Sequence, residues 1–140
     1  MCGFQAAGAA PFLKGEPVKH PETVATAIRI GNPQSWAHAE TAVRESGGHF
    51  DAIEDADILA AQKLLAEREG VFCEPASASS LAGAMRDIAS GKIAAGSSVV
   101  CTLTGHGLKD PDVAIQQATA EPQTVDATRE AVEGALRKGL

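Results

Sequence analysis

Hydroxyl groups and glycines gather in one short stretch of the chain, Thr102-Leu103-Thr104-Gly105-His106-Gly107-Leu108-Lys109-Asp110. The preceding run Ser98-Val99-Val100-Cys101 is apolar and β-branched, which predicts a buried strand over 98–104. In an open α/β sheet, ligands bind beyond the carboxyl ends of the strands, and glycines let a ligand approach the backbone. The pattern therefore indicates a ligand-facing hydroxyl at Thr104, while a purely structural threonine at a strand end stays the alternative.

A second candidate lies in the segment Glu74-Pro75-Ala76-Ser77-Ala78-Ser79-Ser80. Pro75 predicts the first turn of a helix, and the free N–H groups at a helix start favour anions. Small side chains would let a ligand reach this backbone. The alternative is a helix cap whose serines and alanines pack against a sheet.

Other nucleophiles and bases lack the setting that catalysis needs. His106 lies between two glycines, which predicts a solvated loop histidine. Lys109 lies beside Asp110 in a polar turn, whereas a lysine that forms a Schiff base needs burial. The sequence holds no Gly-x-Ser-x-Gly motif, no cysteine has an evident histidine partner, and the remaining histidines lack ligand-like spacing: His20, His38 and His49.

Composition narrows the class of protein. The chain has 140 residues, of which 44% are hydrophobic, enough for one core. Its three cysteines form no Cys-x-x-Cys pair, so no metal site or disulfide framework is expected, only reduced and mostly buried thiols.

The net charge of -6 argues against a nucleic-acid partner. No apolar run approaches the ~18 residues of a membrane span, and no signal peptide is evident, so a cytoplasmic location is expected.

Helices and strands are expected to alternate along the chain, which predicts an α/β fold with a partial parallel sheet and flanking helices. Leu81, Met85 and Ile88 recur at helical spacing and predict the core-facing side of their helix. Residues 1–118 would form the main part of a domain, and 119–140 a linker and a last helix. The expected helices begin at Asn32-Pro33, Asp55, Glu74-Pro75, Asp110-Pro111 and Asp126, and the expected strands cover 49–53, 71–73 and 98–104.

Five segments, taken in order, resemble the threonine synthase family, over about residues 3 to 117. The most telling is Ile28-Arg29-Ile30-Gly31-Asn32-Pro33, which separates that family from the serine and threonine ammonia-lyases. The five segments are Gly3-Phe4-Gln5-Ala6-Ala7-Gly8-Ala9-Ala10-Pro11, residues 21–33, Ser46-Gly47-Gly48, Glu74-Pro75-Ala76-Ser77-Ala78 and residues 102–111.

The resemblance implies the large domain of the tryptophan-synthase β-like fold (fold type II) and the cofactor pyridoxal 5'-phosphate. The implied reaction converts O-phospho-L-homoserine and water to L-threonine and phosphate, commonly in a homodimer. The implied role of Thr104 is a hydrogen bond to the pyridine nitrogen of the cofactor. Glu74, Ser77 and Gly105 would form part of the cofactor-facing wall.

Two motifs of that family are missing from these residues: the Schiff-base lysine of a Ser-Phe-Lys-Asp segment and the Gly-Asn-rich loop that holds the cofactor phosphate. The chain therefore resembles the carboxyl-terminal portion of the enzyme, carries no catalytic residue, and is expected to need the missing amino-terminal part for activity. Two alternatives stay open: a non-catalytic split-enzyme subunit or interaction module, and a fragment of a serine/threonine ammonia-lyase.

Overall fold

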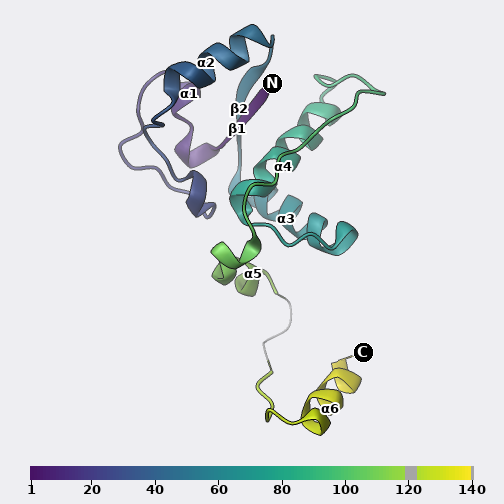
Figure 1. Ribbon diagram of the computed structural model, residues 1–140. Helices are drawn as coiled ribbons and strands as arrows, with labels where there is room; N and C mark the ends of the chain where they lie inside the picture. Colours follow the sequence, from purple (N-terminus) through teal and green to yellow (C-terminus); the bar gives the residue numbers. More distant parts are fainter. Residues whose placement is uncertain (119–122, 140) are drawn as a thin grey trace.

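The computed structural model describes residues 1–118 and 123–139 (Figure 1). Short 3-10 turns cover Ala7–Ala9, Thr26–Ile28 and Gly107–Lys109. No helix among the described residues combines the length and the apolar character that crossing a bilayer requires. The strands and α-helices, in chain order, are β1 (Cys2–Ala6), α1 (Pro11–Lys14), α2 (Trp36–Glu45), β2 (His49–Ile53), α3 (Asp55–Glu69), α4 (Pro75–Ala89), α5 (Pro111–Gln117) and α6 (Arg129–Gly139).

The two strands form a parallel sheet with helices on both faces, so the predicted fold class is confirmed. The register pairs Cys2 with His49 and Ala6 with Ile53. Alternate side chains of a strand point to opposite faces. On one face the ring of Phe12 from α1 stacks on Phe50 of β2, with ring centroids 4.2 Å apart. The other face is covered by α4, with α3 beside it (Figure 1).

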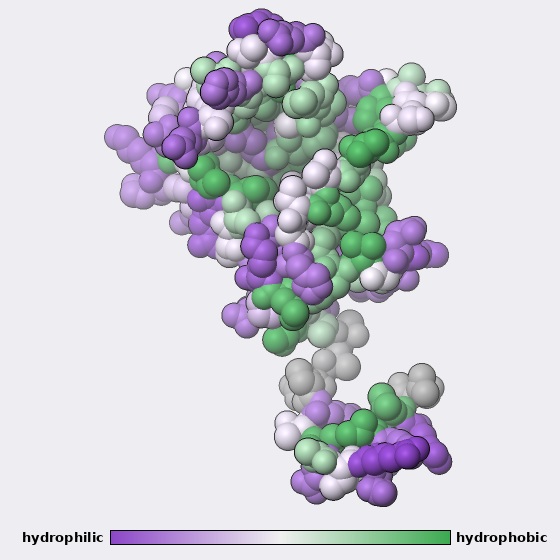
Figure 2. Space-filling model, viewed as in Figure 1, coloured by the Kyte–Doolittle hydropathy of each residue, from purple (hydrophilic) through white to green (hydrophobic). Residues whose placement is uncertain are grey.

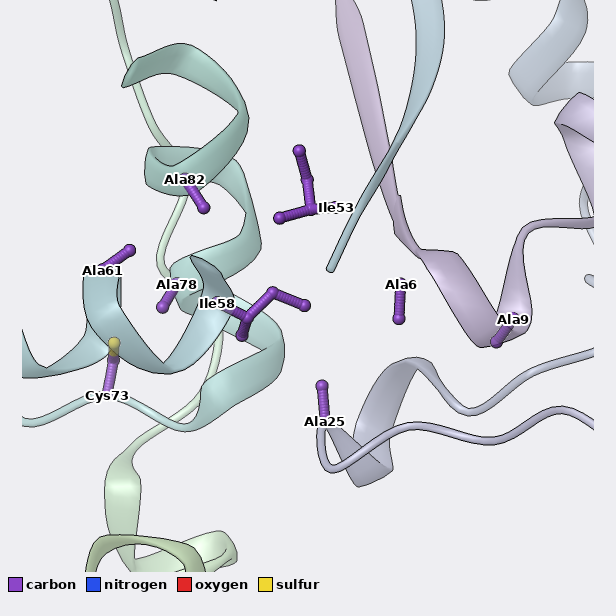
Figure 3. Packing of buried hydrophobic residues seen from close by; sticks show 9 residues of the cluster. All are labelled: Ala6, Ala9, Ala25, Ile53, Ile58, Ala61, Cys73, Ala78 and Ala82. Atoms are coloured by element: carbon purple, nitrogen blue, oxygen red, sulfur yellow. The ribbon is translucent and has the colours of Figure 1, made fainter. Parts of the chain in front are cut away.

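Small residues dominate the core, which lets the elements approach closely. Six of the nine buried residues of the cluster in Figure 3 are alanines. At the contact between α4 and β1, a Cβ on Gly83 would lie only 2.3 Å from the ring of Phe4. The absence of a side chain at Gly83 therefore sets the distance between helix and sheet. The cluster consists of Ala6, Ala9, Ala25, Ile53, Ile58, Ala61, Cys73, Ala78 and Ala82.

The predicted core face of α4 is only partly correct. Leu81 packs against the core, as expected. Met85 is 45% exposed and Ile88 is 53% exposed, whereas Ala78 and Ala82 are buried. Small residues allow α4 to contact both the sheet and α3, and the larger side chains of Met85 and Ile88 point outward. Figure 2 shows the resulting apolar surface on the side of the molecule where α3 and α4 lie.

The predicted strand over 98–104 is also wrong. Its residues have no regular secondary structure, and Val100 is 91% exposed. A strand needs a hydrogen-bonded neighbour. Here the segment is instead tied to α4, because the Ser80 hydroxyl donates to the Thr102 carbonyl oxygen (3.4 Å) and the Cys101 thiol donates to the Ser80 carbonyl oxygen (3.7 Å).

Two further expectations need correction. The predicted strand 71–73 is reduced to a single antiparallel bridge between Cys73 and His106. The sequence Asn32-Pro33 does not open the next helix, which begins only at Trp36. The Pro33 side chain instead lines an apolar hollow against β1 and β2, so packing overrides the local capping signal.

The remaining expectations for helices and strands agree with the structure, with small shifts of boundary. The strand 49–53 and the helices opened by Asp55, Pro75 and Pro111 are confirmed. The last helix begins at Arg129 rather than at Asp126. The predicted linker after Ala118 lies partly outside the described residues, and the proposed domain boundary there stays a prediction.

The expectation that the thiols are mostly buried is wrong. Only Cys73 is buried, while Cys101 is half-buried and Cys2 is exposed.

An ion-pair network joins α4 to the sheet. Arg86 Nη2 lies 2.7 Å and Lys92 Nζ 3.0 Å from Asp51 Oδ2. The hydrogen bond from Lys92 is the largest influence on the Asp51 carboxyl and lowers its pKa below the ordinary value of 3.8; burial opposes it, and the Ala52 N–H and Arg86 add to it. The same bond raises the pKa of Lys92 above 10.5.

The substitution Gly83→Ala tests the helix–sheet distance. We expect a loss of about 1–3 kcal/mol of stability from the clash with Phe4, reduced by the gain of up to about 1 kcal/mol in helix propensity. Gly134→Ala in α6 is the matched control, because no atom lies within 4 Å of its added Cβ. Urea unfolding measures both changes. Equal effects of the two variants would contradict the proposed contact.

Replacement of Lys92 by methionine tests the network through its pH dependence. The folded-state pKa of Asp51 is depressed, so its contribution to stability is present above pH 3.8 and is lost as the pH falls through the lowered value. We therefore expect Lys92→Met to lower the melting temperature at neutral pH, and the difference from wild type to vanish well below pH 3.8. Circular dichroism melts across a pH series measure this.

Lys63→Met is the control, because Lys63 is similarly exposed and, among the described residues, pairs only with Glu67 one helical turn away, at 3.7 Å. Exposed pairs of this kind contribute little. If both variants lowered the melting temperature equally, or the Lys92→Met difference persisted in acid, the assignment would be wrong.

Candidate functional site

The predicted site residues Glu74, Ser77 and Gly105 lie in mutual contact at the start of α4. The Glu74 N–H donates to the Gly105 carbonyl oxygen at 3.0 Å, and the Gly105 N–H donates to Ser77 Oγ at 2.9 Å. The Gly107 N–H donates to the Phe72 carbonyl oxygen at 3.0 Å and continues the same antiparallel link. The segment 104–107 is thus fixed to the first turn of α4 by its backbone.

Position 105 has to be glycine in this arrangement. A Cβ there would lie 1.8 Å from Oε1 of Glu74, whose carboxylate packs directly on the Gly105 backbone. The Glu74 side chain is only 5% exposed, and Lys109 Nζ lies 3.1 Å from its Oε2. A buried carboxylate needs such a partner, because an unpaired charge is costly away from water. Lys109, which the sequence predicts to be a polar-turn residue, is therefore the counter-ion of Glu74.

Thr104 is the exposed member of the group. Thr104 is exposed although the preceding segment is not a strand, because the anchored Gly105 holds the chain at the surface. Among the described residues the Thr104 hydroxyl has no hydrogen-bond partner, so its donor and acceptor capacity is free. Its role toward a ligand stays a prediction.

His106 behaves as a structural loop residue. It is exposed, and its Nδ1 accepts a hydrogen bond from the Leu108 N–H at 3.1 Å. Its ring packs edge-on against Phe72, with centroids 5.6 Å apart. Gly107 is required beside it, because a Cβ would meet the same Phe72 ring at 2.4 Å.

These residues fit the ring side of an aromatic nitrogen cofactor. A threonine hydroxyl can donate to a neutral pyridine nitrogen but is too weak an acid to protonate it. The described site contains one cation, Lys109, and it is already paired with Glu74. A cofactor phosphate would therefore need positive groups or N–H donors from elsewhere.

The Ser77 contact can be tested by stability. In Ser77→Ala the buried Gly105 N–H loses its acceptor, and we expect a loss of about 1–3 kcal/mol. Ser79→Ala is the control: Ser79 is also buried in α4, but its hydroxyl only donates to the Ala76 carbonyl oxygen, so its removal leaves no N–H without a partner. Chemical denaturation of both variants measures the difference. Equal losses would show that Ser77 does not anchor the turn.

The chain is similar to known proteins over most of its length. A family model described as pyridoxal-phosphate dependent enzyme matches residues 1–105. The threonine synthase of Synechocystis sp. is 58% identical over 118 residues, which cover 84% of this chain and 30% of that protein. The threonine synthase of Mycobacterium leprae is 58% identical over 91% of this chain and 36% of its own length. That of Halalkalibacterium halodurans is 49% identical over the whole chain and 40% of its own length.

The chain thus spans 30–40% of the length of these relatives, and the match falls on their carboxyl-terminal portion. Among solved structures, the threonine deaminase of T.th. is similar with a TM-score of 0.50 and 21% identity, over 63% of this chain and 34% of that one. That likeness supports the fold alone. Because the family model covers three quarters of the sequence, the chain belongs to the pyridoxal-phosphate dependent enzyme family.

Proposed function

We propose that this chain forms the cofactor-ring side of a threonine synthase, which converts O-phospho-L-homoserine and water to L-threonine and phosphate. The observation that carries the proposal is the free, exposed hydroxyl of Thr104 on a turn that Gly105 locks to α4. The identity of 58% to threonine synthases over most of the chain supports this substrate rather than that of another family member.

Each residue has a defined task in this proposal. Thr104 donates its hydroxyl proton in a hydrogen bond to the pyridine nitrogen and leaves that nitrogen neutral. Ser77 and Glu74 hold the backbone of Gly105, so the hydroxyl is positioned before the cofactor arrives. Lys109 neutralises Glu74 and keeps an unpaired negative charge away from the ring. When bound, pyridoxal phosphate supplies the electron sink for the reaction.

The partner of this chain is the remaining part of such an enzyme, which would bring the Schiff-base lysine and the phosphate-binding loop. Large apolar side chains that the described structure leaves at the surface support a missing covering element: Val100 is 91% exposed, Ile88 53% and Met85 45%. Apolar surfaces of this kind commonly mark an interface. The completed enzyme would form a homodimer.

The test combines this chain with the amino-terminal portion of the Synechocystis threonine synthase, which is 58% identical in the matched region. Phosphate release from O-phospho-L-homoserine is measured with each part alone and with both. We expect activity only from the combination. Two outcomes would refute the proposal. One is phosphate release by this chain alone, and the other is a combination that shows neither phosphate release nor binding between the two parts. Ammonia release from L-serine or L-threonine in place of phosphate release would instead assign an ammonia-lyase.

In the active combination, Thr104→Val removes the donor at nearly constant volume. We expect kcat to fall about tenfold to a hundredfold, because one hydrogen bond to a buried ring is lost, and we expect little change in KM. Thr104→Ser should restore much of the rate because it keeps a hydroxyl. Thr102→Val is the matched control, being exposed two residues earlier. Equal kcat values for Thr104→Val and Thr102→Val would exclude the assigned contact.

A further inference from the structure

A cysteine, a histidine and an aspartate from three separate elements line up at the far end of α4 from Gly105. Cys2 Sγ lies 3.7 Å from His49 Nδ1, and His49 Nε2 lies 2.8 Å from Asp87 Oδ2. We propose that Cys2 is a covalent modification site at which the thiol exchanges with small-molecule disulfides, with His49 as its base and Asp87 as the group that holds the base. No local pattern along the chain signals this group, because Cys2 and His49 are 47 residues apart.

The sheet register creates the contact. Cys2 and His49 are direct partners in the parallel pair of β1 and β2, so their side chains share one face. The same face is covered by α4, which brings Asp87 onto the other side of the imidazole. The ring of Phe4 packs edge-on against His49, with centroids 6.1 Å apart, and restricts its rotation.

The hydrogen bonds define which nitrogen of His49 carries the proton. A carboxylate only accepts hydrogen bonds, so Asp87 Oδ2 requires the proton on Nε2. The lone pair of Nδ1 then faces Cys2 Sγ and can accept the thiol proton. This is the arrangement in which a third group orients the base of an activated nucleophile. The same three side chains also offer one possible metal-ligand atom each within 4.8 Å of one another. The hydrogen bond from Nε2 to Asp87, however, leaves Nδ1 as the free nitrogen beside the thiol, which suits a proton relay.

Asp87 is held in place by burial and by charge. Its side chain is fully buried, and its Oδ1 accepts no hydrogen bond among the described residues. The cations that face Oδ1 are Lys92 Nζ at 3.7 Å and Arg86 Nε at 3.9 Å. Both also pair with Asp51 on β2. The terminal amine of Met1, next to Cys2, instead donates to Ser46 Oγ at 2.9 Å.

The other two thiols lack the exposure and the nearby base that Cys2 has. Cys73 is buried, and burial raises the pKa of its thiol, which disfavours the reactive thiolate. Cys101 is half-buried and donates its S–H to the Ser80 carbonyl oxygen, which cannot take the proton. Cys2 alone among the three combines exposure with a nearby base.

The reaction balances without a further reagent. The Cys2 proton moves to His49 Nδ1, and the thiolate attacks one sulfur of the disulfide. The new S–S bond forms as the old one breaks, and the second sulfur leaves as a thiolate that takes the proton from His49. Cys2 is oxidised to a mixed disulfide while half of the small disulfide is reduced to a thiol.

The experiment treats the complete chain with oxidised glutathione and follows the mass of the protein, with peptide mapping to assign the site. In wild type we expect Cys2 to be modified before Cys101 and Cys73. Modification of Cys101 or Cys73 before Cys2 in the folded chain would overturn the proposal without any variant.

Substitutions distinguish the effect of the His49 base on the Cys2 rate from the effect of exposure alone. His49→Gln should slow Cys2 modification at pH 7 about tenfold, because it removes the base that accepts the thiol proton. Cys101→Ser is the matched control and should leave the Cys2 rate unchanged. Circular dichroism verifies folding of each variant. An unchanged rate in folded His49→Gln would contradict the role of His49.

Discussion

The close approach of α4 to β1 is the constraint on which both sites depend. It exists because Gly83 presents no side chain to the ring of Phe4, where a Cβ would lie at 2.3 Å. With the helix at this distance, its first turn meets the 104–107 segment and its last turns reach β2 (Figure 1). A larger residue at position 83 would push the helix away from the sheet and weaken both ends together.

Two buried carboxylates fix the position of α4 at its ends. Glu74 is paired with Lys109 from the following 3-10 turn. Asp87 accepts a hydrogen bond from His49 of β2 and also faces the cations of Lys92 and Arg86. Each charge is stable away from water only while its partner is present. The helix therefore cannot slide along the sheet without leaving a buried charge unpaired. The same rigidity holds Gly105 at one end and orients the imidazole at the other, so the two proposed sites share one structural element.

Local sequence signals predicted helices and strands better than they predicted tertiary contacts. Alternation predicted the strand 49–53, Asp55 predicted the start of α3 and Pro75 that of α4, because these patterns act within a few residues. The strand expected over 98–104 failed because a β-branched run becomes a strand only when another strand lies beside it. Similarly, the periodicity of Leu81, Met85 and Ile88 predicted the helix correctly, but only Leu81 of the three packs against the core.

The sequence by itself determined the class of fold, the family, and the choice of Glu74, Ser77, Thr104 and Gly105 as candidate site residues, because these follow from local patterns and from ordered motifs. Only the tertiary structure decided that Lys109 neutralises Glu74, that Thr104 stays exposed, and that Cys2 meets His49. Such pairs depend on strand register and on helix packing between distant segments. No spacing along the chain encodes that geometry, since it arises only when the sheet and α4 come together.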